Sequence, residues 1–262
     1  MKLPFFQVDA FTGSTFRGNP AGVVIMKEWL SEETMQSIAA ENNVSETAFM
    51  HPRGNAFEIR WFTPEVEVDL CGHGTLASAF VVFDQGLAHG DEVQFAAKVG
   101  VLTVKRNGPL LVMDFPSRPP ETAQVTDALE EALGARPVAA LRARDLMAVF
   151  DTEEDVAALN PRFDLVAELD AVGVIATAPG RRVDFVSRFF APGVGVPEDP
   201  VTGSTHCTLV PYWAGRLGKS KLLARQISKR GGELRCEDRG DRVTIGGQVV
   251  CYLRGEIEVP RS

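Results

Sequence analysis

The sequence predicts an α+β protein made of two pseudo-symmetric halves, each a sheet wrapped around a nearly uncharged central helix. The first observation is a repeat: the run Arg60-Trp61-Phe62-Thr63-Pro64 recurs 128 residues later, from position 60 to position 188, as Arg188-Phe189-Phe190-Ala191-Pro192. Each copy then leads into a Gly-rich turn and an apolar segment. Period-two alternation of apolar residues, which is typical of strands, surrounds both copies.

The first half begins with strands and a capped helix. Ser31 is a typical N-cap, and Glu32 and Glu33 in the first turn suit the helix dipole, so we expect a helix that ends near Asn42. Alternating apolar residues between turn formers predict strands near residues 3–11, 23–26, 48–50, 57–61, 66–70, 94–95, 99–106 and 110–115.

A second helix is predicted from residue 72 to about residue 83. Gly72-His73-Gly74 is a helix-opening turn, and the run Thr-Leu-Ala-Ser-Ala-Phe-Val-Val that follows carries no charge. A helix without a polar face must be buried on nearly every side. We therefore expect this helix to lie inside the sheet of the first half.

The second half repeats this order after a Pro-rich linker at residues 116–120. The predicted domains are residues 1–117, completed by the C-terminal strand, and residues 118–262. The two central helices, which begin near His73 and Gly203, are expected to converge on one cleft. In the second half we expect strands near residues 141–150, 174–177 and 183–190 and through residue 259, and helices near residues 163–169 and 203–217.

Composition excludes several classes of partner and location. The formal net charge is −8 and the isoelectric point is near 5.1, which argues against binding to nucleic acid or to an anionic membrane surface. No run of 18 apolar residues suggests a membrane span, and the start of the chain resembles a strand and not a signal peptide. The expected location is the cytoplasm.

The cysteines and histidines show no local spacing of a metal site or disulfide framework. The cysteines lie at positions 71, 207, 236 and 251 and the histidines at 51, 73, 89 and 206. Neither set contains a CxxC motif or an i, i+4 histidine pair. The sequence therefore predicts no metal requirement.

Four sequence blocks carry a resemblance to a known family. Together they resemble the signature blocks of the PhzF-like (phenazine biosynthesis) isomerases, in the same order and over nearly the whole chain. The resemblance implies a diaminopimelate epimerase-like fold with a curled mixed or antiparallel sheet around each central helix. It also implies a homodimer that shifts a proton and a double bond in a dihydro-hydroxyanthranilate, without metal or organic cofactor. The blocks are Gly18-Asn19-Pro20-Ala21-Gly22-Val23, Ser45-Glu46-Thr47-Ala48-Phe49, the first copy of the repeat with Asp69-Leu70-Cys71-Gly72-His73-Gly74-Thr75, and the second copy with Glu198-Asp199-Pro200-Val201-Thr202-Gly203-Ser204.

Glu46 is the candidate general base for such a proton transfer. It interrupts the uncharged stretch at residues 44–49 as a strand begins, where a carboxylate is costly unless it is functional or paired. The residues alone leave open a surface glutamate at a strand end. The resemblance implies that Glu46 is the family's catalytic glutamate.

The starts of the two central helices are candidate binding sites for a small anionic metabolite. Backbone N–H groups at Gly72, His73 and Gly74, and at Gly203 and Ser204, are expected to lie unpaired at a helix N-terminus, where they could bind an anion. Each glycine alone could instead serve a tight turn. The pairing of the two turns across the repeat favours a ligand.

The two copies of the repeat differ at the expected site. Racemases of this superfamily have a cysteine at each helix start, whereas here Cys71 stands at the first and Asp199 at the second. A thiol pair is absent, which favours a shift in which Glu46 abstracts the proton and Asp199 or His73 handles the polar groups of the substrate. Asp199 and His73 could alternatively cap the two helices.

The sequence also suggests roles for other residues and two alternative functions. The resemblance implies that Asn19 lines the pocket, together with Cys71 as a substrate contact. His206 and Cys207 are neighbours on a helix, so they cannot both face one substrate, and His206 receives no role. Two alternatives to the isomerase are a racemase or epimerase that uses Cys71 and a non-catalytic binding protein on the same fold. The sequence does not identify the substrate.

Overall fold

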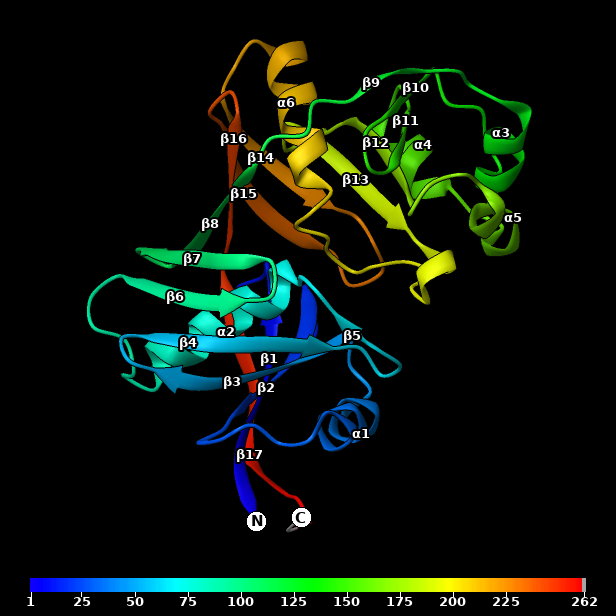
Figure 1. Cartoon of the computed structure of the whole chain (residues 1–262). Helices are drawn as coiled ribbons and strands as arrows, with labels where there is room; N and C mark the ends of the chain where they lie inside the picture. The colour runs from blue at the N-terminus through cyan, green and yellow to red at the C-terminus, as the bar shows by residue number, and fades with distance from the viewer. Residues whose placement is uncertain (261–262) are drawn as a thin grey trace. The chain divides into compact units, whose positions relative to one another are not determined.

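The computed structural model describes residues 1–260 and divides into two compact units. The first comprises Met1–Asp114 with the C-terminal segment from Gly246, and the second comprises Phe115–Ile245. Figure 1 labels the elements of both. Within the residues that the structure describes, no helix is long and apolar enough to cross a membrane.

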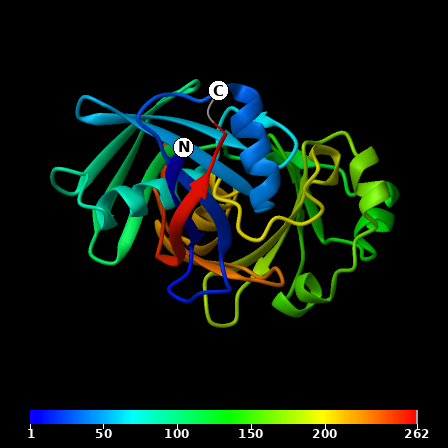
Figure 2. The same ribbon diagram turned by 90° about the horizontal axis from the view of Figure 1, so that it is seen from below.

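The first unit is a mixed sheet that curls around one helix. Pairing runs from β17 through β1, β2, β3 and β4 to β6, β7 and β8, with β2–β3 and β4–β6 parallel. The pairing of Lys2 with Glu258 brings the two ends of the chain together (Figure 2). The strands are β1 (Lys2–Ala10), β2 (Asn19–Ile25), β3 (Glu46–Arg53), β4 (Ala56–Phe62), β5 (Glu67–Val68), β6 (Glu92–Ala97), β7 (Gly100–Asn107), β8 (Leu110–Pro116) and β17 (Val249–Glu258).

Helix α2 (Gly72–Asp84) is the central helix of the first unit, as the uncharged run predicts. It contacts β1, β2 and β3, and most of its residues are buried (Figure 1). Gly74 is required here by close packing. A Cβ at this position would lie 2.9 Å from both Cys71 Sγ and Trp61 Cδ1, closer than real Cβ atoms approach.

Helix α1 (Glu32–Asn42) also follows the sequence prediction. The Ser31 hydroxyl accepts the Thr34 N–H at 3.2 Å, and Asn43 ends the helix in the left-handed conformation. The buried face of α1 carries Met35 and Ala39, which pack in an apolar cluster against the sheet. Helix α1 thereby contacts β3 and β4.

The second unit has its own sheet, with short helices on one face and α6 (His206–Leu217) packed on its strands. Within α6, Trp213 stacks on Phe185 of β13 with ring centroids 5.7 Å apart. The remaining strands are β9 (Glu121–Ala123), β10 (Ala139–Arg142), β11 (Leu146–Val149), β12 (Val174–Pro179), β13 (Phe185–Phe190), β14 (Lys221–Gln226), β15 (Gly232–Asp238) and β16 (Arg242–Gly247). The short helices are α3 (Asp127–Leu133), α4 (Glu153–Ala158), α5 (Phe163–Glu168) and the 3₁₀ turn η1 (Pro192–Val194).

Several predicted elements need correction. The strand expected at residues 141–150 is two antiparallel strands, β10 and β11, because the chain turns where the Ala143 N–H bonds to the Asp145 carbonyl. Helix α6 starts at His206 and not at Gly203, since residues 203–205 form a turn. The alternation at residues 66–70 yields only the two-residue β5, and its outer residues Val66 and Leu70 are exposed.

Candidate active site

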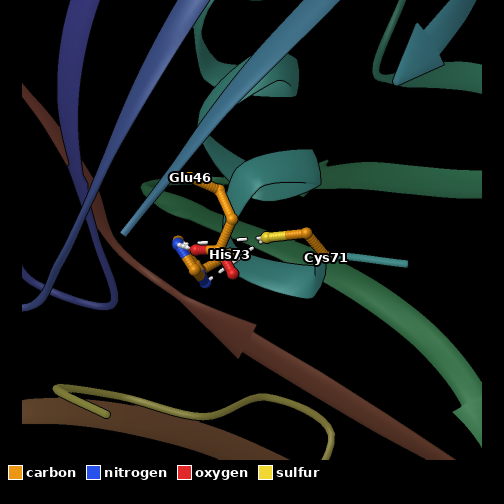
Figure 3. A group of neighbouring side chains, drawn as sticks. All are labelled: Glu46, Cys71 and His73. Atoms are coloured by element: carbon orange, nitrogen blue, oxygen red, sulfur yellow. Dashed lines mark hydrogen bonds and ion pairs between the residues drawn. The ribbon is translucent and has the colours of Figure 1, made fainter. Parts of the chain in front are cut away.

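Three side chains of the first unit converge at the start of α2. Glu46 is the first residue of β3, Cys71 is the N-cap of α2, and His73 lies in the first turn. His73 Nε2 lies 2.9 Å from Glu46 Oε2, and His73 Nδ1 lies 3.6 Å from Cys71 Sγ (Figure 3). The sheet brings Glu46 here, because β3 runs parallel to β2 beside the central helix. Of the predicted residues, the structure thus groups Glu46, His73 and Cys71.

Glu46 is paired with His73 and keeps part of its side chain exposed. Its Oε2 is buried and lies 2.9 Å from His73 Nε2, and 17% of the side chain is exposed. The ion pair fixes the carboxylate, and the exposed part of the side chain can meet a ligand. A carboxylate placed in this way is a candidate general base.

His73 is held close to two acidic groups. Its side chain is only 7% exposed, and burial opposes a positive charge on the ring. The contacts of the ring with Cys71 and with the Glu46 carboxylate outweigh that effect and raise the pKa of His73 well above its usual value. His73 can therefore carry a proton beside the Glu46 carboxylate at neutral pH.

Cys71 serves as the cap of the helix. Its Sγ accepts the Gly74 N–H at 3.2 Å, so Cys71, and not His73, occupies the N-cap position of α2. The expectation that the Gly74 N–H is free for a ligand is therefore wrong, because the thiol already occupies it. Burial, with the charge of Glu46 in addition, raises the pKa of the Cys71 thiol. A buried thiol with a raised pKa is a poor source of thiolate at neutral pH.

Asn19 lies beside this group and meets His73 at Nδ1, whereas Glu46 meets the ring at Nε2. Its Nδ2 is 3.3 Å from His73 Nδ1, and its Oδ1 accepts the Ser45 hydroxyl at 3.0 Å. The Asn19 side chain is fully buried. Sequence reasoning missed Ser45, although its position next to Glu46 was a signal that could have identified it.

The residues predicted in the second unit form hydrogen bonds within that unit. Asp199 Oδ2 accepts the Thr202 hydroxyl at 2.5 Å, and the Gln226 amide bonds to the backbone at both Asp199 and Thr202. Because α6 begins at His206 after the N-cap Thr205, Asp199 does not cap this helix. Gln226, 24 residues beyond Thr202, gives no signal in the sequence.

Gly203 and Ser204 lie in the turn just before α6. The Ser204 hydroxyl accepts from Arg144 Nη2 at 3.3 Å, and Arg144 is itself paired at 2.7 Å with the buried carboxylate of Asp145. Sequence reasoning also missed Arg144. His206 is fully buried in the second unit, where desolvation lowers its pKa to about 4.

The group around His73 also has the donor types of a cation site. One ligand atom from each of Glu46, Cys71 and His73 lies within 4.8 Å of the others. Local spacing could not reveal this cluster, because Glu46 comes from a different strand. The absence of a metal requirement stays a prediction.

Comparison with known proteins extends these observations. A family model described as "Phenazine biosynthesis-like protein" (PhzC-PhzF) matches residues 8–255. An uncharacterized isomerase of Pseudomonas aeruginosa is 51% identical over 260 residues, covering 99% of this chain and 100% of that protein. The crystal structure of a PhzF-family phenazine biosynthesis protein from Enterococcus faecalis matches with a TM-score of 0.97 and 45% identity, covering 99% of this chain and 100% of that one.

A more distant structure shows the reach of the fold. A hydroxyproline epimerase from Agrobacterium vitis has a TM-score of 0.63 with this chain at 10% identity, covering 98% of this chain and 92% of that one. The epimerase-like α+β fold expected from the sequence is confirmed.

Proposed function

We propose that this chain, which belongs to the phenazine biosynthesis-like (PhzC-PhzF) family and is an isomerase, shifts a proton and a double bond within a small carboxylate-bearing metabolite. In this proposal Glu46 removes the proton from carbon and returns it elsewhere on the same face of the substrate. No metal or organic cofactor takes part. A homodimer is proposed as well, and light scattering at the monomer mass would refute it.

The observation that carries the proposal is the partly exposed Glu46 carboxylate, which is paired with His73 at the start of α2. A general base must lie within hydrogen-bond reach of the proton that it abstracts, and a carboxylate has several acceptor positions, so a pair with one neighbour leaves others for a substrate. The ion pair with His73 holds the Glu46 carboxylate in place, and 17% of the side chain stays exposed. The other carboxylate of the proposal, Asp199, already accepts a hydroxyl from Thr202.

The surroundings of Glu46 supply stabilisation for the charge that remains on the substrate. Helix α2 has no acidic residue in its first turn, so its partially positive end favours an anionic group. A protonated His73 adds a full positive charge at the same place. We propose that His73 stabilises the delocalised anion formed when Glu46 takes the proton, and that Asp199 contacts polar groups of the substrate.

The racemase alternative is less well supported. It requires Cys71 to act as a second base, yet Cys71 Sγ accepts the Gly74 N–H and its pKa is raised by burial. A thiol in this state is mostly protonated at neutral pH and does not abstract a carbon-bound proton.

Solvent-deuterium incorporation tests the proposal. The protein is incubated in D₂O with a dihydro-hydroxyanthranilate, the substrate class that family resemblance implies, and with a panel of small unsaturated carboxylates. We expect deuterium at one carbon and a moved double bond, detected by NMR and mass spectrometry. Exchange at a stereocentre with loss of optical rotation would instead establish the racemase. Absence of exchange with every probe would favour the non-catalytic binding protein.

A further inference from the structure

A continuous line of side-chain contacts leads from Ser45 through Asn19 to His73 and Glu46. The Ser45 hydroxyl donates to Asn19 Oδ1 at 3.0 Å, Asn19 Nδ2 meets His73 Nδ1 at 3.3 Å, and His73 Nε2 faces Glu46 Oε2 at 2.9 Å. Ser45 and Glu46 are neighbours at the start of β3, and Asn19 starts the adjacent parallel strand β2. The contacts therefore link Ser45 to its neighbour Glu46 by way of Asn19 and the ring of His73.

Exposure divides this line into an inner and an outer part. Glu46 keeps 17% of its side chain exposed, whereas Asn19 is 0% exposed. A fully enclosed amide cannot meet a substrate without displacing the residues around it. The burial of Asn19 favours a role exerted through His73 over direct contact with a ligand.

The hydrogen-bonding capacity of Asn19 suits both protonation states of His73. When the ring is neutral with its proton on Nε2, Nδ1 is an acceptor for Asn19 Nδ2, and Ser45 donates to Asn19 Oδ1. When the ring is protonated, the Nδ1 proton needs an acceptor. The amide can turn over, so that Oδ1 accepts from Nδ1 and Nδ2 donates to the Ser45 oxygen, because a hydroxyl is both donor and acceptor.

We propose that Asn19 is a positioning residue whose amide, braced by Ser45, holds the Nδ1 edge of His73 in either protonation state, so that Nε2 always faces Glu46. The charged or titratable groups that face the ring are Glu46 from β3 and Cys71 from the N-cap of α2. Neither can replace Asn19, since Glu46 meets the ring at Nε2 and the Cys71 thiol is a weak partner of Nδ1 at 3.6 Å. The effect on turnover rests on the proposed function, whereas the placement of the ring does not.

Nitrogen NMR of the ligand-free protein tests this placement directly. Two-bond ¹H–¹⁵N spectra report which ring nitrogens of each histidine carry protons, and the signals lost in His73→Gln assign His73. In Asn19→Leu, which keeps the volume and removes the contacts of the amide with His73 and Ser45, we expect the His73 nitrogen signals to shift and broaden. In Asn19→Asp, which can only accept, we expect Nδ1 to stay protonated to a higher pH than in the wild type.

Two further variants keep the test decisive. Ser45→Ala removes the hydroxyl that donates to Asn19, and it should shift the same His73 nitrogen signals by a smaller amount. Because Ser45 is partly exposed, this variant provides a test that does not depend on the folding of Asn19→Leu. Thr47→Val is the matched control, because Thr47 is buried on the same strand and accepts from Asn42 Nδ2 at 3.1 Å. Its His73 signals should be unchanged.

Turnover provides a separate readout. If Glu46 and His73 act together, Asn19→Leu should lower kcat about tenfold, the equivalent of one lost hydrogen bond, with a smaller effect on KM. A raised KM with unchanged His73 nitrogen signals would show Asn19 to be a substrate contact and overturn the proposal. Shifted signals without any exchange activity in the wild type would leave the positioning role intact and refute the proposed function instead.

Discussion

The two units have the same local arrangement of side chains at the sequence repeat, residues 60–64 and 188–192. In the first, the Arg60 guanidinium lies 5.2 Å from the centre of the Phe62 ring and pairs with Glu67 at 2.6 Å. In the second, Arg188 lies 4.9 Å from the Phe190 ring and pairs with Glu198 at 2.7 Å. The repeat therefore marks a structural element, a strand end fixed by a stacked and paired arginine. It does not by itself mark the chemistry.

The units differ at the position of the base. Register places Thr47 opposite Phe62 and Val174 opposite Phe190, so the equivalent of Glu46 in the second unit is Gly173. A Cβ at Gly173 would lie 2.5 Å from the Phe189 ring, which leaves no space for any side chain. The same fold thus holds a carboxylate in one copy and an aromatic ring in the other, which locates the proposed proton transfer in the first unit.

The largest effect is expected from removing the base. Glu46→Gln keeps the size and reach of the side chain but cannot accept a proton from carbon, so solvent-deuterium incorporation should fall by about 10² to 10⁴ while the substrate still binds. Glu58→Gln is the matched control, because Glu58 forms a similar pair with His51, at 2.8 Å, in the same unit. A fully active Glu46→Gln protein would reduce Glu46 to a strand-end residue.

The two buried histidines should give pH dependences of opposite sign. His206 has a folded pKa of about 4, so the unfolded chain binds a proton that the folded chain does not, and stability falls by about 3 kcal/mol as pH drops from 6.5 to 4. His73 has a raised pKa, so its contribution is fully present below pH 6.5 and is lost as pH rises through the folded value.

Denaturant unfolding at several pH values checks this difference. His206→Gln should remove the loss of stability on the acid side, and His73→Gln should remove the loss on the alkaline side. Each variant is compared with the wild type at the same pH, which cancels the titration of other groups. If the unfolding free energy of the two variants changed with pH in the same way, the predicted opposite pH dependence of His206 and His73 would be wrong.

Replacement of Gly173 tests whether the second copy is closed. Gly173→Ala brings a methyl group within 2.8 Å of the Phe190 carbonyl oxygen as well as against the Phe189 ring, and overpacking of this kind costs roughly 1–3 kcal/mol. Gly215→Ala is the control, since nothing lies within 4 Å of a Cβ there and alanine favours the interior of α6. The midpoint temperature of thermal unfolding should therefore fall for Gly173→Ala and rise slightly for Gly215→Ala.

The sequence predicted features that depend on local patterns. The Ser31 cap, the uncharged run of α2 and the repeated phrase each act within a few residues, and the structure confirms α1 and α2 closely. The helices α3 and α4 were not predicted, although Thr126 and Thr152 cap them in the usual way. Such short helices are weak signals because packing, more than propensity, decides whether they form.

The site was only partly predictable because it is assembled from separate strands. Glu46, His73 and Asn19 could be listed as candidates, but their order in space depends on the parallel pairing of β2 with β3. No local pattern shows that Asn19 lies behind His73 or that Cys71, and not His73, caps α2. The second unit shows the same limit, since Gln226 approaches Thr202 from a distant strand.

The smallest effect, none, is expected from removing metal. Glu46, Cys71 and His73 form a cluster that could receive a cation, but metal binding needs a thiolate, and the raised pKa of Cys71 opposes its formation. Exhaustive chelation should therefore leave deuterium incorporation unchanged. In Cys71→Ser the hydroxyl is a good N-cap, so activity should stay within a few-fold of the wild type. The contrary result would be a wild-type activity that chelation removes and a divalent ion restores, together with no such restoration in Cys71→Ser. That result would identify the cluster as a metal site, with Glu46 as a metal ligand and not as the base.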